Sequence, residues 1–247
     1  MSGTKNTYLE IHKNFCAFVD SCCKYNCFTR SIDLQKKKFE ECNHFIAQIK
    51  LYKSQAVSAN DEYIANQFFH MQCILNALSS VFSMWCLIKT DKYQKAWNSL
   101  IDAQEYVVIA LKIEQYEGLL NFQSNLLSIE EAMFPSWKLY NSPGMTETIG
   151  ICSICKENFA LCDHIENQIY MGSLCQRIDR EIIDYNHTAF VEKPRDRRCI
   201  ITEISDDNGN MLDYFTWEKT GEKREISGDA LAHVTTVMLH FNGLDVG

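Results

Sequence analysis

The first half of the chain contains almost none of the residues that interrupt helices. Between Asn6 and Phe134 there is no proline, and Gly118 is the only glycine. Apolar residues recur in this region at intervals of three and four, which is the period of an amphipathic helix. Pro135 ends the pattern, because proline cannot continue a helix. The region therefore predicts a bundle of about five helices, with approximate ranges 6–25, 31–57, 58–89, 91–112 and 116–133.

The third predicted helix is unusual because it carries almost no charge. From Tyr63 to Ile88 no residue is formally charged unless His70 is protonated, and such a run is long enough to span a bilayer. Polar residues interrupt it, however, and only scattered lysines flank it. We therefore expect no membrane span. The helix should instead be buried on all sides in the bundle, or be covered by a second copy in a homodimer.

The sequence pattern changes after about residue 140. The stretch 137–150 contains a Ser-Pro-Gly run and predicts a turn-rich bridge between two domains. These domains would be a helical bundle, 1–140, and a smaller module, 141–247. The predicted fold is mainly α, with an α+β module that includes a β-hairpin and a C-terminal helix.

Three patterns support the α+β module. Runs of β-branched and apolar residues predict strands at 188–191 and 199–205. The Asp-Asp-Asn-Gly-Asn sequence at 206–210 predicts a hairpin turn that leads into a strand at 211–217. Ser227 and Asp229 are placed to cap a last amphipathic helix that reaches residue 241.

The composition is that of an ordered, acidic protein. Hydrophobic residues make up 46% of the chain, with only 10 glycines and 3 prolines, so it should fold throughout. A net charge of −8 opposes binding to nucleic acid or acidic membranes unless a local basic patch exists. Twelve cysteines without a secretory leader predict a reducing cytoplasm. There cysteines are buried thiols or metal ligands, and we expect Cys16, Cys23 and Cys27 to be buried thiols.

One group of cysteines has the spacing of metal ligands. Cys152 and Cys155 are separated by two residues, and Cys162, His164 and Cys175 follow. A Cys-x-x-Cys pair can direct two thiolates at one ion, at about 2.3 Å for zinc. Thiolates and an imidazole suit zinc better than calcium or magnesium, although they could also hold iron. The sequence therefore predicts a bound zinc ion.

Five candidates compete for the four positions of a tetrahedral zinc. We expect Cys152, Cys155 and His164 to be ligands, and the fourth to be either Cys162 or Cys175, which would reach the ion from a helix at 176–183. In either case the protein fills every position, which is typical of a structural zinc. A catalytic zinc would keep a position open for water.

The cysteine and histidine array resembles one in a poorly characterised group of bacterial and prophage-linked zinc proteins. There the Cys-x-x-Cys pair is followed by Cys-x-His, a Tyr-x-Gly step and a final cysteine, which here are Cys152, Cys155, Cys162, His164, Tyr170, Gly172 and Cys175. Two positions that are usually glycine in that group are Lys156 and Asn167 here. The resemblance implies bound zinc and a role in a prophage-linked or host-defence assembly, with no established activity.

Two other functions have to be weighed against a zinc protein that recognises another protein. Nucleic-acid binding would use the basic loop, which we define as Lys193, Arg195, Arg197 and Arg198, by phosphate contacts. Catalysis would need an unrecognised site, since the chain has no phosphate-binding loop, nucleophile elbow or HExxH motif. We therefore expect a structural zinc protein that recognises another macromolecule, with a nucleic-acid-binding protein and an enzyme with an unrecognised site as the alternatives.

Overall fold

The structure, a computed structural model, describes residues 2–226, 232–240 and 244–247, with side chains described from Tyr8 onward. Its contacts divide the chain into two compact units. Unit 1 consists of Met1–Leu126, Ile149–Asp179 and Leu244–Gly247, and unit 2 of Leu127–Thr148 and Arg180–Gly243. The metal-ligand candidates thus belong with the helices. The sequence-based division into domains 1–140 and 141–247, which concerns independent folding, stays a prediction.

The five predicted helices are present, close to the predicted ranges. Side-chain caps set two of the starts: Ser31 accepts a hydrogen bond from the N–H of Leu34, and Asp61 accepts one from the N–H of Ile64. The helices are α1 (Ser2–Cys22), α2 (Ile32–Ser58), α3 (Glu62–Ile88), α4 (Tyr93–Ile113) and α5 (Glu117–Met133).

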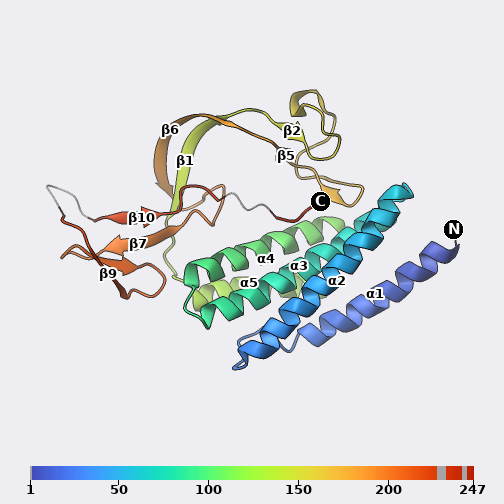
Figure 1. The fold of residues 1–247 in the computed structure, drawn as a ribbon, viewed down its shortest axis with the longest axis horizontal. Coiled ribbons are helices and arrows are strands. Elements are labelled where there is room, and N and C mark those ends of the chain that lie inside the picture. Colours follow the sequence, from blue (N-terminus) through green and yellow to red (C-terminus); the bar gives the residue numbers. More distant parts are fainter. Residues whose placement is uncertain (1, 227–231, 241–243) are drawn as a thin grey trace. The chain divides into compact units, whose positions relative to one another are not determined.

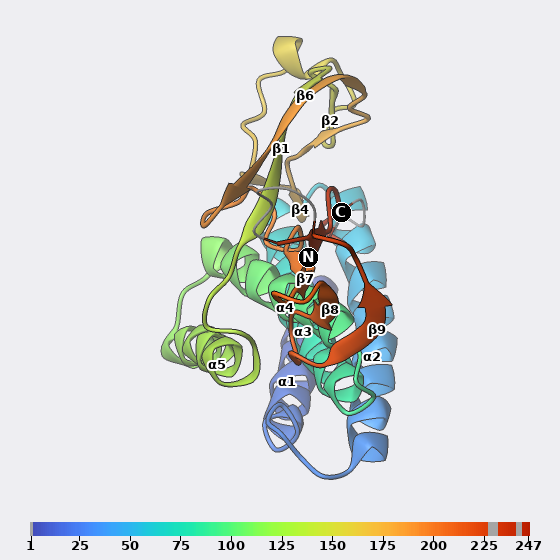
Figure 2. The same ribbon diagram turned by 90° about the vertical axis from the view of Figure 1, so that its left-hand side faces the viewer.

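Helix α3 lies at the centre of unit 1, between α2 and α4 (Figures 1 and 2). It is long and apolar enough to cross a membrane, but 78% of its most apolar window is buried inside the protein. Burial of this kind is typical of the core helix of a soluble protein, as the sequence predicted. The same chain thus covers most of α3, and a homodimer through residues 63–88 stays a prediction.

Polar side chains of α3 bind the last residues of the described chain. The amides of Gln72 and Asn76 donate hydrogen bonds of 3.3 and 3.4 Å to the carbonyl of Asp245. The Asp245 N–H donates to the hydroxyl of Tyr106 at 2.8 Å, and its carboxylate forms an ion pair of 2.5 Å with Lys50. These bonds explain how an otherwise apolar helix can carry amides: Gln72 and Asn76 are buried, and the Asp245 carbonyl accepts a hydrogen bond from each.

Lys53 of α2 is a buried amine, only 6% exposed. Its Nζ makes no hydrogen bond within the described structure and lies 4.9 Å from the centre of the Phe69 ring. Burial lowers the pKa of Lys53 to about 8, although Cys73 and Asp245 nearby favour the charged form. Burying the protonated amine of Lys53 therefore costs free energy when the protein folds.

The variant Lys53→Met should be more stable than the wild type at pH 7, by about 1 to 3 kcal/mol, because it removes a buried charge. The pKa of Lys53 is about 8 in the folded protein and ordinarily 10.5. Between these two pH values the unfolded wild type binds more protons than the folded wild type. Wild-type stability therefore rises with pH in this window, and the difference between the two proteins should shrink. Urea denaturation at several pH values measures this difference in the free energy of unfolding. Lys37→Met, at a side chain that is 72% exposed, should show no such pH dependence.

Unit 2 contains the end of α5 and two antiparallel sheets (Figure 1). A long ribbon pairs β1 (Tyr140–Glu147) with β6 (Ile182–Val191). A four-stranded sheet has the order β10 (Val234–Thr236), β7 (Ile201–Ser205), β8 (Asn210–Asp213) and β9 (Lys219–Lys223). The predicted hairpin turn joins β7 to β8, and the Asp206 carboxylate accepts the N–H groups of Asn208 and Asn210 at 2.9 and 2.8 Å.

The prediction of a mainly α fold is wrong. About 47% of the residues are helical, but 19% lie in strands of several small antiparallel sheets. The expected bridge at 137–150 contains β1, and the expected helix at 176–183 contains β5 (Arg177–Ile178) and the start of β6. Residues 227–231 and 241 of the expected C-terminal helix lie outside the described residues. Its described part forms no helix and contains β10, because the β-branched residues of this strand pair with β7.

Candidate metal centre

The metal-ligand candidates lie on a segment, residues 149–179, that contains only very short elements. Strand β2 (Ile151–Cys152) pairs with β5, and β3 (Ile169–Tyr170) pairs with β4 (Ser173–Leu174). After Cys152 the chain turns, with the N–H of Lys156 bonded to the Cys152 carbonyl at 3.0 Å. Lys156 and Asn167 have φ of 64° and 67°, the left-handed conformation that glycine adopts most easily. These are the two positions at which related arrays were expected to carry glycine.

Three thiols and one imidazole converge in this segment. One donor atom each of Cys152, Cys155, Cys162 and His164 lies within 4.8 Å of all the others. The Cys155 and Cys162 sulfurs are 3.5 Å apart, and the Cys162 sulfur is 3.3 Å from His164 Nδ1. In a tetrahedral zinc site with bonds of about 2.3 and 2.05 Å, ligand atoms are separated by about 3.6 to 3.8 Å. The four residues are therefore close enough to hold one metal ion.

The neighbours of His164 hold its ring toward the thiols. The ring packs edge-to-face on Tyr170, with 4.7 Å between the ring centres. The Tyr170 hydroxyl accepts the N–H of Ile165 at 3.1 Å, so the tyrosine fixes both the ring and the backbone beside it. Support of this kind orients metal ligands before the ion binds.

Cys175 lies beside the four-residue group and is not part of it. Its sulfur is 3.8 Å from that of Cys152, and both side chains are fully buried. Burial and the neighbouring Cys152 raise the pKa of the Cys175 thiol to about 12. Burial also raises the pKa of Cys152, but hydrogen bonds from the N–H groups of Cys155 and Ile154 and from the thiols of Cys162 and Cys155 together lower this pKa to about 6. The two sulfurs therefore lie within hydrogen-bonding distance of each other.

Serine substitutions should separate the two candidates for the fourth ligand. Cys162→Ser should lose metal to a competing chelator under conditions in which the wild type retains it. Cys175→Ser should keep stoichiometric metal with an affinity lowered by about 10- to 100-fold at most, as when a group that supports a ligand is removed. Cobalt substitution measures this, because sulfur-to-cobalt charge-transfer absorption scales with the number of bound thiolates. Loss of cobalt–thiolate absorption from Cys175→Ser alone would make Cys175 the ligand.

Helices α3 and α4 hold the metal-binding segment through its backbone. The N–H groups of Met171 and Gly172 donate to the side chains of Glu62 and Asn66 at 3.3 and 2.7 Å. Lys112 of α4 donates to the carbonyl of Asn167 at 2.9 Å. No motif in the sequence marks Glu62, Asn66 or Lys112 as positioning residues. Asn66 is a polar residue in a largely apolar helix, and this could have indicated that its side chain binds another segment.

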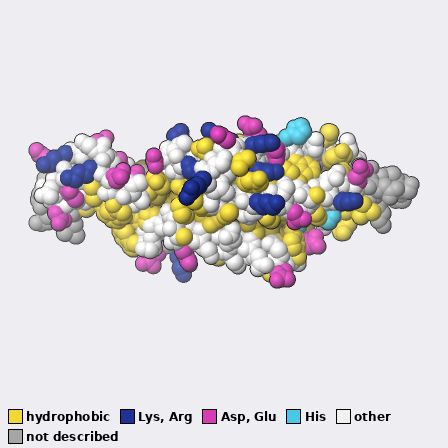
Figure 3. All heavy atoms as spheres, turned by 90° about the horizontal axis from the view of Figure 1, so that it is seen from below, with side chains coloured by type: hydrophobic (Ala, Val, Ile, Leu, Met, Phe, Trp, Pro, Cys, Tyr) yellow, Lys and Arg dark blue, Asp and Glu magenta, His cyan; other side chains and the backbone are white. Residues whose placement is uncertain are grey.

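The basic loop carries less free charge than its sequence indicates. Arg195 pairs with Glu147 at 2.9 Å, Arg197 with Glu130 at 2.5 Å and Arg198 with Asp196 at 3.0 Å. Arg198 is also buried, 4% exposed, so it cannot contact a phosphate. Figure 3 shows basic, acidic and apolar side chains interspersed over the described part of one face. An extended nucleic-acid interface would require the three arginine pairs to break.

Among the residues that the structure describes, the other cysteines form no second group of three or more potential metal ligands. Cys16, Cys23 and Cys27 are exposed, so the expectation that they are buried thiols is wrong. Within the described residues the group around Cys152 is the only one in which three or more potential ligands converge.

The chemistry of this group is the main functional indication in the structure, because sulfur and imidazole donors favour zinc and related metals. The resemblance to prophage-linked zinc proteins stays a prediction. No protein-family model, no curated protein and no solved structure matches this chain.

Proposed function

We propose that this chain is a zinc protein in which the ion has a structural role and the segment it organises recognises another protein. One observation carries the proposal: three sulfurs and one imidazole nitrogen, within 4.8 Å of one another, can occupy all positions of a tetrahedral ion. Such a site has no place for a substrate or a reactive water. The resemblance described above favours a role in a bacterial prophage-linked or defence assembly, and the free cysteines favour the cytoplasm.

The metal-binding segment needs the ion because it has almost no core of its own. Of its 31 residues from Ile149 to Asp179, the buried ones are Cys152, Gly172, Leu174 and Cys175. Leu174 is the one large hydrocarbon side chain among them, and a segment with so little buried apolar surface gains little free energy from burial. Zinc binding supplies folding free energy directly in segments of this type.

The same segment presents apolar side chains to solvent next to two of the ligands. Leu161, which precedes Cys162, is 85% exposed, and Ile165, which follows His164, is 63% exposed. Exposed apolar residues on a backbone fixed by a metal can bind a protein without a large loss of conformational entropy. Glu157 and Asp163 are also exposed, so a nucleic acid would be repelled here. The partner expected is a protein with an apolar site bordered by basic residues.

The double variant Leu161→Asp/Ile165→Asp should keep the metal and the fold but lose the partner. The matched control is Leu51→Asp on α2, where an equally apolar side chain is 59% exposed. Quantitative affinity purification from the native cell should recover one protein with the wild type and with Leu51→Asp, and at least tenfold less of it with the double variant. Equal recovery with all three proteins, at equal zinc content, would contradict the proposed surface.

A further inference from the structure

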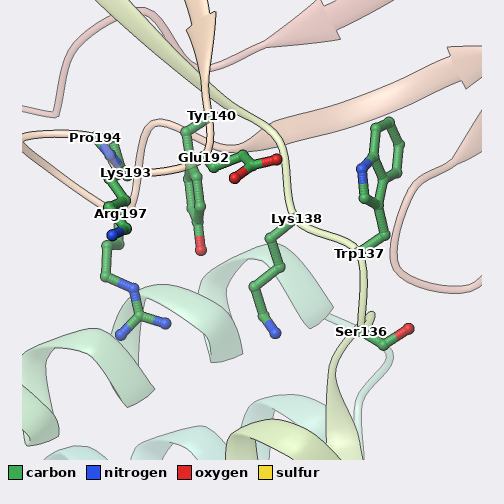
Figure 4. A pocket seen from close by; sticks show the side chains of 8 residues that line it. All are labelled: Ser136, Trp137, Lys138, Tyr140, Glu192, Lys193, Pro194 and Arg197. Carbon is green, nitrogen blue, oxygen red and sulfur yellow. The ribbon is translucent and has the colours of Figure 1, made fainter.

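Unit 2 contains a pocket that the proposed function does not use. Its volume is about 500 Å³, within the range of about 300 to 1,000 Å³ that is usual for small-molecule sites. The walls come from the residues that precede β1 and the loop that follows β6 (Figure 4). The lining residues are Ser136, Trp137, Lys138, Tyr140, Glu192, Lys193, Pro194 and Arg197.

The charges of the pocket favour an anion. Lys138, Lys193 and Arg197 line it, against one carboxylate, that of Glu192. Glu130 lies behind the wall, 8% exposed, and holds Arg197 at 2.5 Å and Lys138 at 3.4 Å. Even with Glu130 counted, the cations outnumber the carboxylates, in a chain whose net charge is −8. A buried carboxylate that fixes two cations reduces the entropy they lose when an anion binds.

One end of the pocket can hold a phosphate. In Figure 4 the Tyr140 hydroxyl, the Arg197 guanidinium and the Lys138 ammonium extend in the same direction. Tyr140 is 3% exposed, and burial raises the pKa of its hydroxyl even though Arg197 is hydrogen-bonded to it. The hydroxyl therefore stays protonated and can donate a hydrogen bond. A guanidinium and an ammonium beside a donor are the groups that bind phosphate oxygens in proteins.

The other end can hold a flat ring. The Trp137 indole is 53% exposed and packs edge-to-face on Tyr214, with 6.1 Å between ring centres. The Tyr214 hydroxyl donates to the Trp137 carbonyl, which holds the residue in place. In Figure 4 the indole points away from the cations, and the Glu192 carboxylate lies between Tyr140 and Trp137. An exposed indole can stack on a nucleobase, and a carboxylate can accept hydrogen bonds from ribose hydroxyls.

We propose that this pocket binds a ribonucleotide. The phosphate lies against Lys138, Lys193 and Arg197, a ribose hydroxyl bonds to Glu192, and the base stacks on Trp137. In Figure 4 the Glu192 carboxylate lies between Tyr140 and Trp137, as the sugar lies between the phosphate and the base in a nucleotide. Two sources share this chemistry: a free mononucleotide and the terminal nucleotide of single-stranded RNA. The site belongs to unit 2, so it is independent of the metal centre.

Calorimetric titration of the full zinc-loaded chain tests the proposal with five probes: AMP, 2′-deoxy-AMP, adenosine, inorganic phosphate and a short single-stranded RNA with a 5′-phosphate. AMP should bind at least tenfold more tightly than adenosine or phosphate, and its affinity should fall as salt is raised. Deoxy-AMP should bind more weakly than AMP, and Glu192→Gln should reduce that difference. Tighter binding of RNA than of AMP would identify a strand end as the ligand, and the reverse would identify a free nucleotide.

Variants assign the binding to the pocket. Lys193→Ala and Trp137→Ala should each weaken AMP binding at least tenfold. The matched control is Trp217→Ala, because Trp217 is 54% exposed and also 6.1 Å from Tyr214 but does not line the pocket. Circular dichroism and the melting temperature check that each variant is folded. Failure of both AMP and RNA to bind, phosphate binding as tight as that of AMP, or equal losses in Trp137→Ala and Trp217→Ala would overturn the proposal.

Discussion

The variant Cys155→Ser is expected to lose its zinc and, with it, the ordered structure of residues 149–179. Cys155 is exposed, so the substitution removes little buried surface and opens no cavity. The effect should come from the missing thiolate alone. Structural zinc contributes about 10 to 16 kcal/mol of apparent binding free energy in small zinc-dependent peptides, more than the rest of this segment can supply. The measurements are zinc content and the rate of limited proteolysis within 149–179.

The control for this prediction is Cys23→Ser, which replaces another exposed thiol that has no metal to bind. It should leave both zinc content and proteolysis unchanged. A strong chelator added to the wild type should reproduce the Cys155→Ser pattern, and added zinc should reverse it. A chain that keeps its protease resistance without metal would show that zinc does not stabilise the segment.

The variant Gly172→Ala is expected to destabilise the docking of the metal-binding segment on α3, by about 2 to 4 kcal/mol. Gly172 has a φ of +73°, and a Cβ placed there would lie 2.9 Å from the carbonyl oxygen of Ala65 and 3.0 Å from the Lys53 side chain. The carbonyl belongs to the helix backbone and cannot move away cheaply. The glycine would have to shift, which would lengthen its 2.7 Å hydrogen bond to Asn66.

A second glycine allows the backbone strain to be separated from the steric contact. Gly221 has a φ of +90°, but a Cβ added there would meet nothing within 4 Å. Gly221→Ala should therefore show the strain alone, about 1 kcal/mol. Urea denaturation gives both values. An equal loss of stability in the two variants would mean that the close approach of Gly172 to α3 contributes nothing.

The parts of the fold that depend on neighbouring residues could be predicted from the sequence. The helices follow from apolar spacing and from caps such as Ser31 and Asp61, and the hairpin after β7 follows from the turn residues at 206–210. The errors occur where pairing between distant segments decides the structure. Residues 176–183 have a pattern compatible with a helix, but β5 and β6 pair with β2 and β1, which lie about 25 to 50 residues earlier. No local pattern contains that information.

The metal centre could likewise be predicted where it depends on neighbouring residues, and neither it nor the pocket could be predicted where distant segments meet. The Cys-x-x-Cys spacing was enough to locate the metal-ligand group, since ligands on one short segment can only converge nearby. It could not decide between Cys162 and Cys175, because the position of Cys175 depends on the pairing of β3 with β4 and of β2 with β5. The pocket was missed for a similar reason. The pocket brings Lys138 and Tyr140 next to residues 192–197. Only the basic loop was recognisable as a motif in the sequence.

The hydrogen bonds between α3 and the segment 244–247 can form only late in the synthesis of the chain. Translation produces α1 to α4 first, then Ile149–Asp179, and it reaches Asp245 only after all of unit 2 has left the peptidyl-transferase centre. Until then the amides of Gln72 and Asn76 lack the carbonyl that they bind in the finished structure. Partly folded chains of this kind expose surfaces that are covered later and are the usual substrates of chaperones. Unit 1 is therefore completed only after residues 244–247 are made, although its helices α1 to α4 precede all of unit 2 in the chain.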